Sequence, residues 1–249
     1  MSAATWIASS AILLASLFSG TAQAAGCRDV AFEDTPFTVC EADPATDDIR
    51  LFLRDDDGRL LGTFENVDAS LASEGRRLAF AVNAGMYHPD RRPVGLYVED
   101  GTERARIVTR KGPGNFGLLP NGVLCIGDGW ARVVESRAFA AEPPACRYAT
   151  QSGPMLVIDG ALHPRFLPDS RSRYIRNGVG VTPEGRMIVA ISNRPVTFHR
   201  FARFFRDVLG TPNALFLDGN ISRLYAPELR RQDFGFPMGP ILGVTVPTD

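Results

Sequence analysis

Short apolar runs dominate the hydrophobic pattern of the chain, and most have the length and composition of β-strands. The run at 49–54 partly alternates apolar and polar side chains, whereas the run at 78–82 is apolar throughout. The first pattern predicts a half-buried strand and the second a fully buried one. Runs of the same kind lie at 94–98, 130–134, 155–158, 187–191 and 214–217. The chain is therefore predicted to be rich in β-sheet.

Asn-Gly and Asp-Gly steps separate many of these runs, and such dipeptides favour tight hairpin turns. The first residues of the seven steps are Asp57, Asp100, Asn121, Asp128, Asp159, Asn177 and Asp218. A further turn at 183–186 predicts a hairpin between the segments 176–181 and 187–191.

Two segments have helical character. In 66–74, Asp68 is a candidate N-cap and Gly75 a stop signal. In 197–209, phenylalanines recur at helical spacing after the candidate cap Thr197, and arginines occupy the other, solvated face. No repeat or linker divides the chain. We therefore predict one α+β domain on a large mixed or mostly antiparallel sheet with a few helices.

The N-terminus has the pattern of a signal peptide. An uncharged apolar or small-residue run over 3–18 precedes Ala22-Gln23-Ala24, an A-x-A cleavage pattern, although no Lys or Arg precedes the run. The run is too short and too rich in small residues for a transmembrane helix. We predict a signal peptide at 1–24, a mature domain at 25–249 without a membrane span, and a periplasmic or secreted location. A lipoprotein anchored at Cys27 is the less favoured alternative, because the usual Leu before the Cys is missing.

The four cysteines agree with export, since all of them follow the predicted cleavage site. An even number of cysteines in an oxidising compartment indicates two disulfides. Three pairings are possible, and we favour the two local ones, Cys27 with Cys40 and Cys125 with Cys146. Each would stabilise the fold by about 3 kcal/mol. No metal or cofactor motif is visible, although Asp218 and Asn220 carry oxygen donors that suit Ca²⁺ or Mg²⁺.

The positive and negative charges of the chain are almost balanced. The chain carries 27 basic and 28 acidic residues, a formal net charge of -1. This gives no reason to expect binding to nucleic acid or to an anionic membrane. Only Lys111 among the basic residues is a lysine. Arginine forks suit carboxylate and phosphate groups, although a GC-rich genome is the simplest explanation of the bias.

Four segments place polar side chains beside glycines at the ends of predicted strands, where rigid elements can present them to a ligand. Each alone is typical of a hairpin. The segments are Phe80 to His88, Gln151 to Leu156, Arg176 to Val181 and Ala214 to Ser222.

Together and in this order, the four segments resemble the phosphodiester glycosidase family. The resemblance covers roughly 78–225 and is greatest with the short exported bacterial members. The family motifs Asn-Gly/Ala-Gly-aromatic, Ser-Gly, Arg-x-x-x-Gly and Asp-Gly-Gly-Gly-Ser are matched by 83–87, 152–153, 176–180 and 218–222. In the last motif, Asn220 and Ile221 stand where the family has two glycines.

The resemblance implies an exported hydrolase that breaks a sugar C1–O bond and releases a phosphomonoester. A phosphate leaving group needs less protonation than an alkoxide, so one carboxylate and a set of cationic or amide donors would suffice. We expect Arg176 to bind phosphate and His88 to be a second donor or acid. Asp218 is the expected base, nucleophile or oxocarbenium stabiliser, and Glu99 a weaker carboxylate candidate. Expected substrate contacts are Asn83, Gly85, Gln151, Ser152, Gly153, Asn177, Gly219, Asn220 and Ser222.

Two alternatives remain open at this point. The chain could bind phosphorylated glycan in the envelope without turnover, in which case Ile221 would line a pocket that holds ligand but releases no product. It could also be a purely structural envelope factor, which predicts no saturable binding of any sugar phosphate. In the leading interpretation the partner is a carbohydrate-phosphate substrate, and no cofactor is expected.

Overall fold

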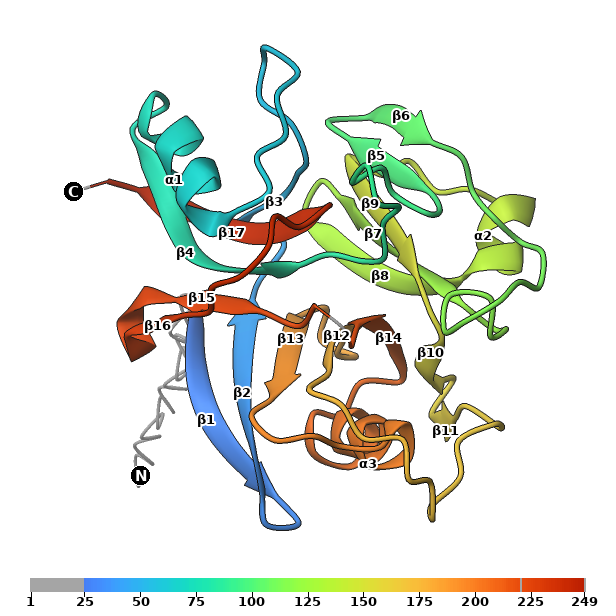
Figure 1. Cartoon of the computed structure of the whole chain (residues 1–249). Coiled ribbons are helices and arrows are strands. Elements are labelled where there is room, and N and C mark those ends of the chain that lie inside the picture. Colours follow the sequence, from blue (N-terminus) through green and yellow to red (C-terminus); the bar gives the residue numbers. More distant parts are fainter. Residues whose placement is uncertain (1–24, 220, 249) are drawn as a thin grey trace, which may run out of the picture.

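The fold is a set of antiparallel sheets around one core (Figure 1). The computed structural model describes residues 25–219 and 221–248, so the predicted signal peptide and Asn220 lie outside the described residues. Within them, seventeen strands form three sheets of seven, five and five strands. The prediction of a single α+β domain with mostly antiparallel strands is confirmed. The strands are, however, divided among three sheets.

The first sheet has the spatial order β1-β2-β13-β12-β14-β10-β11. Its strands are β1 (Gly26–Phe32), β2 (Thr35–Ala42), β10 (Met155–Ile158), β11 (Ala161–Leu162), β12 (Asn177–Val181), β13 (Met187–Ser192) and β14 (Asn213–Asp218). Strand β13 is buried along its whole length, which explains its continuous apolar run.

The second and third sheets cover the other sides of the core. The second has the order β16-β15-β4-β17-β3, and the third β6-β5-β9-β7-β8. The second contains β3 (Asp48–Phe52), β4 (Arg76–Asn83), β15 (Leu224–Ala226), β16 (Arg231–Gln232) and β17 (Ile241–Pro247). The third contains β5 (Tyr97–Glu99), β6 (Thr102–Ala105), β7 (Gly122–Gly127), β8 (Trp130–Glu135) and β9 (Tyr148–Ser152).

Three α-helices pack on the sheets, and two of them were predicted. They are α1 (Phe64–Ala72), α2 (Ser136–Ala141) and α3 (Phe198–Arg203). The predicted cap of the first was wrong: Thr63 caps α1 by accepting from the Asn66 amide, while Asp68 accepts from the Leu78 amide. Thr197 caps α3 as predicted.

The predicted helix over 197–209 is not α-helical throughout. After α3 the backbone changes to a π-helical turn, η1 (Phe204–Val208), and the left-handed Gly210 follows. A single 3₁₀ turn, η2 (Pro227–Leu229), follows β15. No helix in the described part of the chain is long and apolar enough to cross a membrane.

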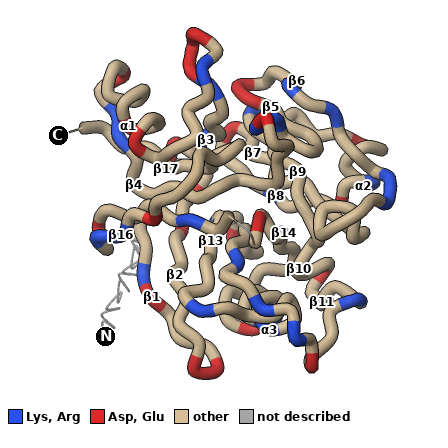
Figure 2. Tube along the Cα trace, viewed as in Figure 1, with Lys and Arg blue, Asp and Glu red and all other residues tan. Residues whose placement is uncertain are grey.

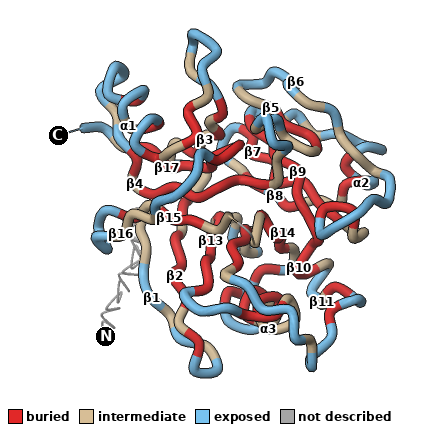
Figure 3. The backbone as a smooth tube through the Cα atoms, in the orientation of Figure 1, coloured by how far each residue is buried: buried red, intermediate tan, exposed pale blue. Residues whose placement is uncertain are grey.

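A hydrophobic core common to all three sheets makes the chain one domain. Leu215 and Val189 contribute from the first sheet, Leu51 and Phe80 from the second, and Leu124 from the third. Figure 3 shows that the strands carry most of the buried residues, whereas the connecting loops are largely exposed. Helix α1 packs on β4, and α3 packs on β10 and β11. The sheets therefore stabilise one another.

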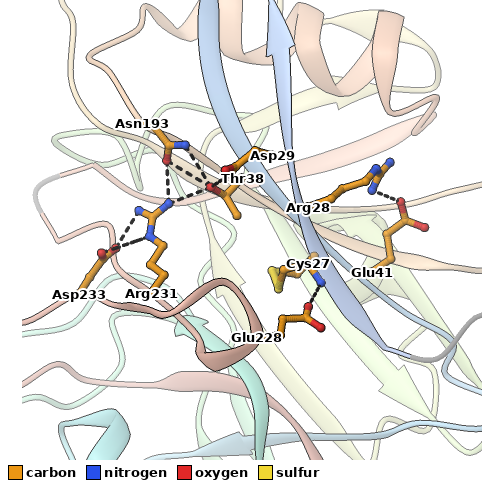
Figure 4. The surroundings of a disulfide bond; sticks show 10 residues. Cys27, Arg28, Asp29, Thr38, Glu41, Asn193, Glu228, Arg231 and Asp233 are labelled. Carbon is orange, nitrogen blue, oxygen red and sulfur yellow. Dashed lines mark hydrogen bonds and ion pairs between the residues drawn. A yellow bond between two sulfur atoms is a disulfide. The ribbon is translucent and has the colours of Figure 1, made fainter.

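Both disulfides expected from the sequence are present. Cys27 bonds to Cys40, directly opposite on the neighbouring strand, and Cys125 of β7 bonds to Cys146. Figure 4 shows the surroundings of the first bond: a Glu228 carboxylate oxygen accepts a hydrogen bond from the Cys27 amide, and Arg231 lies in the same region. The first bond therefore ties the edge strand β1 to β2.

Three of the seven Asn-Gly and Asp-Gly steps do not form the turn of a hairpin. Asn121 is buried just before β7, and Asn177-Gly178 lies inside β12. Asp218 ends β14, and the next strand, β15, belongs to another sheet. A Cβ on Gly178 would lie 2.8 Å from the carbonyl oxygen of Leu215 and 3.2 Å from the Phe201 ring. This glycine therefore permits close packing of strands and helix rather than a turn.

Candidate active site

A cavity of about 590 Å³ lies at the end of β14, between the segments that follow β4 and precede β12. Three residues predicted for the site, Arg176, Asp218 and Gly219, contribute to its wall. The other lining residues are Met86, Tyr87, Val94, Asn115, Ser172, Tyr174 and Ile221. Its volume is in the range of small-molecule pockets.

The backbone around Asp218 is fixed by three predicted substrate-binding residues. The Asp218 amide donates to Asn177 Oδ1 at 3.1 Å, and Ser222 Oγ donates to the Asp218 carbonyl at 2.7 Å. Ser152 Oγ donates to the carbonyl of Leu217 at 2.8 Å. Hydroxyl and amide groups from β9, β12 and the segment after β14 therefore hold the carboxylate-bearing residue in place.

Asn83 connects the second sheet to this arrangement. Asn177 Nδ2 donates to both Asn83 Oδ1 and the Asn83 carbonyl, at 3.0 and 3.1 Å. Asn83 Oδ1 also accepts from the Arg223 amide at 2.9 Å. Both asparagine side chains are fully buried. A buried amide pair with its hydrogen bonds made is rigid and specific in orientation, so it fixes the end of β4 against the start of β12.

Arg176 is the largest nearly fully buried side chain, at 1% relative exposure. Its Nε donates to the Val196 carbonyl at 3.0 Å and its Nη2 to the Ser172 carbonyl at 3.4 Å. The guanidinium carbon lies 3.6 Å from the Phe198 ring centroid. Within residues 25–219 and 221–248, Arg176 forms no ion pair with a carboxylate. Burial lowers the pKa of Arg176 to about 10, which still leaves the group charged at neutral pH.

The carboxylate and the guanidinium border the same cavity. Asp218 Oδ1 accepts from the Gly219 amide at 2.6 Å, and a Cβ on Gly219 would lie 3.5 Å from Arg176 Nη1. Burial raises the pKa of Tyr87, and the charge of Asp218 raises it further, so the phenol remains protonated near the carboxylate. The arrangement presents a cation, a carboxylate and a hydroxyl to one bound molecule.

None of the other predicted site residues that the structure describes lines this cavity. His88 lies on a neighbouring cavity. Gln151 is buried, and its side chain bonds internally to the Leu96 and Val108 amides, the Val108 carbonyl and Ser136 Oγ. A Cβ on Gly153 would lie 2.5 Å from Asn121 Cβ, so this glycine is required for packing.

The positions of Gly85 and Ser222 are also explained by backbone conformation and internal hydrogen bonds. Gly85 has φ +128°, and a Cβ there would lie 3.2 Å from Thr150 Oγ1, so an L side chain would be strained. Ser222 Oγ lies near both the Ile175 carbonyl and Asn177 Oδ1. Asn220 lies outside the described residues.

Sequence reasoning did not select several lining residues. Ser172 and Tyr174 precede Arg176 on an exposed segment and are exposed themselves. The Tyr174 ring centroid lies 5.4 Å from the guanidinium carbon. Asn115 lies in a glycine-rich stretch, 112–117, whose composition was the available signal. Among the described residues, no group of three or more His, Cys, Asp or Glu could hold a metal ion.

The fold resembles those of known proteins. Over 88% of this chain it matches the catalytic domain of zebrafish N-acetylglucosamine-1-phosphodiester α-N-acetylglucosaminidase, covering 81% of that chain, with a TM-score of 0.60 and 14% identity. A hypothetical protein from Synechocystis matches over 88% of this chain with a TM-score of 0.58 and 14% identity, and the match spans 61% of that chain. At these identities the matches show a shared fold.

Comparison of sequences identifies the family of the chain. The uncharacterized protein YigE of Escherichia coli is 32% identical over 204 residues, which cover 81% of this chain and 80% of the relative. The family model for phosphodiester glycosidases matches residues 76–238, the region that contains every element of the cavity described above. The chain therefore belongs to the phosphodiester glycosidase family.

Proposed function

We propose that this protein hydrolyses glycosyl phosphodiesters, adding water across the sugar C1–O bond to release the free sugar and a phosphomonoester. Membership of the family supports a hydrolase of this type. The observation that carries the proposal is the buried Arg176 guanidinium, which shares a cavity wall with Asp218 and has no carboxylate partner among the described residues.

Arg176 is the proposed phosphate-binding residue. A buried charge without an opposite charge is costly, and its cost falls when an anion binds beside it. The Nε and Nη2 of Arg176 already donate to backbone carbonyls, while Nη1 lies near Gly219, which lines the cavity. A phosphodiester oxygen within reach of Nη1 would accept a charge-assisted hydrogen bond. This bond would also stabilise the charge that develops on the leaving phosphate.

Asp218 is the proposed carboxylate on the sugar side. It acts as base, nucleophile or stabiliser of positive charge at C1, and the fixed backbone around it supplies the orientation that each role needs. Asn83, Asn177, Ser152 and Ser222 are proposed to act through Asp218 by holding its backbone, directly or through one another. Tyr87 is proposed to donate to the carboxylate or to a sugar oxygen.

We propose that the protein acts outside the cytoplasm, in the periplasm or after secretion. The two disulfides fit an oxidising compartment. The A-x-A pattern at 22–24 supports export through a cleaved signal peptide. Glycans of the envelope or the extracellular space are then the accessible substrates.

The test is hydrolysis of the methyl diester of α-N-acetylglucosamine 1-phosphate by the purified mature protein. We expect wild type to release N-acetylglucosamine and methyl phosphate. Arg176→Ala and Asp218→Asn should each lower kcat/KM by about 10³-fold or more. Arg206→Ala changes a partly exposed arginine that pairs with Asp207 and does not line the cavity. It is the matched control and should behave as wild type. Turnover at the wild-type rate in both site variants would refute the assignment.

A second function is favoured by one observation. Ile221 lines the same cavity as Asp218, at a position where the family motif has glycine, so a bulky side chain stands where the family has none. The protein would then bind phosphorylated glycan without turnover. In that case wild type binds the methyl diester but releases no sugar over hours, and Ile221→Gly gains activity.

A further inference from the structure

Two exposed phenylalanines lie on the loop between β16 and β17, residues 233–240. Phe234 is 76% and Phe236 79% exposed, which makes them the most exposed large hydrophobic side chains in the described part of the chain. The stretch 234–240 contains no charged residue, and Figure 2 shows this connection mostly in tan. Neighbouring exposed apolar side chains mark a contact with another molecule more often than isolated ones do.

Hydrogen bonds hold the backbone of this loop in place. The Phe236 carbonyl accepts from Arg223 Nη1 at 2.6 Å. The Met238 amide donates to the Gly62 carbonyl at 2.7 Å. Arg223 is itself nearly buried, at 9% exposure. A fixed backbone that displays two apolar side chains loses little conformational freedom when a ligand binds, so the loop is suited to binding.

The loop is continuous with one wall of the candidate active site. Met238 belongs to a hydrophobic cluster against which Tyr87 and Ile221 also pack, and both of these residues line the active-site cavity. A Cβ on Gly239 would lie 2.6 Å from the Tyr87 ring, so the loop backbone packs directly against that ring. Met238 and Phe234 line one small cavity of about 200 Å³. Apolar atoms therefore extend from the wall of the active-site cavity to the exposed phenylalanines.

The proposed reaction decides which part of the substrate stays on the phosphate. Breaking the sugar C1–O bond leaves the second ester group, an alcohol, attached to the phosphate at Arg176. A phenylalanine ring has no hydrogen-bonding atom, so the two rings offer no partner to the hydroxyls of a polar alcohol. They remove alkyl carbon from water, and this contribution grows with the apolar area that is buried. An apolar alcohol therefore fits this surface better than a polar one.

We propose that this alcohol is a long alkyl or isoprenoid chain, which makes the substrate a lipid-linked sugar phosphodiester. The chain lies over Tyr87 and Ile221 and reaches Phe234 and Phe236. The inference rests on the proposed function and names the class of its leaving group. It also accounts for Ile221, because an apolar side chain at a family glycine position extends the apolar wall of the cavity.

The experiment measures by calorimetry the binding of phosphomonoesters, which are products of the proposed reaction. Octyl phosphate is compared with methyl phosphate and with glucose 6-phosphate, whose alcohol is polar. The double variant Phe234→Ser/Phe236→Ser removes the two exposed rings. Val208→Ser is the matched control, because Val208 is 44% exposed on η1 and lines neither the active-site cavity nor the cavity at Phe234. Urea unfolding confirms that all the proteins are folded.

We expect wild type and Val208→Ser to bind octyl phosphate at least about 30-fold more tightly than methyl phosphate, because one buried methylene group contributes about four-fold. In the double variant this ratio should fall to about three-fold or less, since the outer part of the chain remains in water. Arg176→Ala should weaken the binding of both esters, because it removes the phosphate contact that they share.

Four results would each overturn the lipid-linked substrate: equal affinities for the two esters in wild type, an unchanged ratio in the double variant, tighter binding of glucose 6-phosphate than of octyl phosphate, or full affinity for octyl phosphate in Arg176→Ala. If the double variant also abolished a dimer seen by sedimentation, or binding to phosphatidylglycerol vesicles, while the ratio stayed unchanged, the phenylalanines would contact a second copy or a bilayer instead.

The proposed function is tested separately by hydrolysis of the methyl diester, whose methyl group is too short to reach the loop. Tight binding of octyl phosphate without hydrolysis of that diester would refute the proposed function and leave the apolar subsite standing. Hydrolysis with equal affinities for octyl and methyl phosphate would do the reverse.

Discussion

In the proposed function, Arg176 alone provides the anion site of a protein that has almost zero net charge. Its guanidinium lies against the Phe198 ring, with the Tyr174 and Phe216 rings further away at 5.4 Å. Aromatic faces stabilise a cation without neutralising it, whereas a carboxylate partner would compete with the substrate. Aromatic packing therefore leaves the positive charge of Arg176 free to interact with a phosphate group.

This explanation predicts that Phe198 positions Arg176. Phe198→Leu should weaken competitive inhibition by inorganic phosphate and raise KM by about ten-fold, since a desolvated cation–π contact contributes about 1 to 2 kcal/mol. Phe198→Tyr keeps the aromatic face and should restore most of the affinity.

Inhibition constants and KM for the methyl diester measure the effect. Phe32→Leu is the control, because Phe32 lies under Arg203 in a cation–π pair that does not line the cavity. If the Phe198 and Phe32 variants lost phosphate affinity equally, or if Phe198→Tyr did not restore it, Phe198 would contribute only general packing.

At the scale of elements, strand positions followed from the sequence better than side-chain roles did. The runs at 78–82, 187–191 and 214–217 lie in β4, β13 and β14, because continuous apolar runs bounded by turn residues have few alternatives. The run at 94–98 overlaps β5 only at its end, and α2 was missed because six residues are too few for a helical period to show.

The candidate site was predictable in part, for a physical reason. Motif matching identified Arg176 and Asp218, which share a cavity. Motif matching could not distinguish a polar side chain that contacts ligand from one that hydrogen-bonds to the backbone, because both kinds lie next to glycine. Asn177 and Gln151 are of the second kind, and only the three-dimensional path of the hairpin after Gly85 places His88 on another cavity.

Strands β3, β4 and β17 are joined by the Asp48 carboxylate, which gives a pH-dependent prediction. Asp48 Oδ2 accepts from Thr245 Oγ1 at 2.7 Å and pairs with Arg50 and Arg76 at 2.8 and 3.1 Å. Burial alone would raise the pKa of Asp48, but the hydrogen bonds from Arg50 and Thr245 and the charges of the two arginines outweigh it and lower the pKa.

A carboxylate with a lowered folded-state pKa stabilises the fold above its unfolded pKa, and this stability is lost as the pH falls through the folded value. Asp48→Asn should therefore lower the free energy of unfolding by about 1 to 3 kcal/mol at pH 7. The difference from wild type should shrink below about pH 4. Urea unfolding at pH 7 and at pH 3 checks this, and a deficit that is independent of pH would contradict it.

At the scale of the whole molecule, the site lies where all three sheets meet. Asn83 comes from the second sheet, Ser152 from the third, and Asn177 and Asp218 from the first. Their hydrogen bonds connect the sheets at one point. Because the sheets share one core, we expect the site to form only when the whole domain is folded.

The two disulfides stabilise the fold without lining the cavity. Each closes a short loop, with sequence separations of 13 and 21 residues. Replacing Cys125 and Cys146 together by Ala should lower the free energy of unfolding by about 3 kcal/mol in the chain-entropy model. Activity of the folded variant should persist, because neither cysteine lines the cavity. An unchanged urea midpoint would show that this bond does not constrain the unfolded chain.

The proposed function requires that the bond broken is the sugar C1–O bond. The most direct measurement is hydrolysis of the methyl diester of α-N-acetylglucosamine 1-phosphate in water enriched in ¹⁸O, followed by mass spectrometry of the phosphate products. Attack of water at C1 leaves all the original oxygens on phosphorus, so we predict unlabelled methyl phosphate. Labelled methyl phosphate, or release of sugar 1-phosphate, would show attack at phosphorus and contradict the assignment of Arg176 and Asp218 to a glycosidase site.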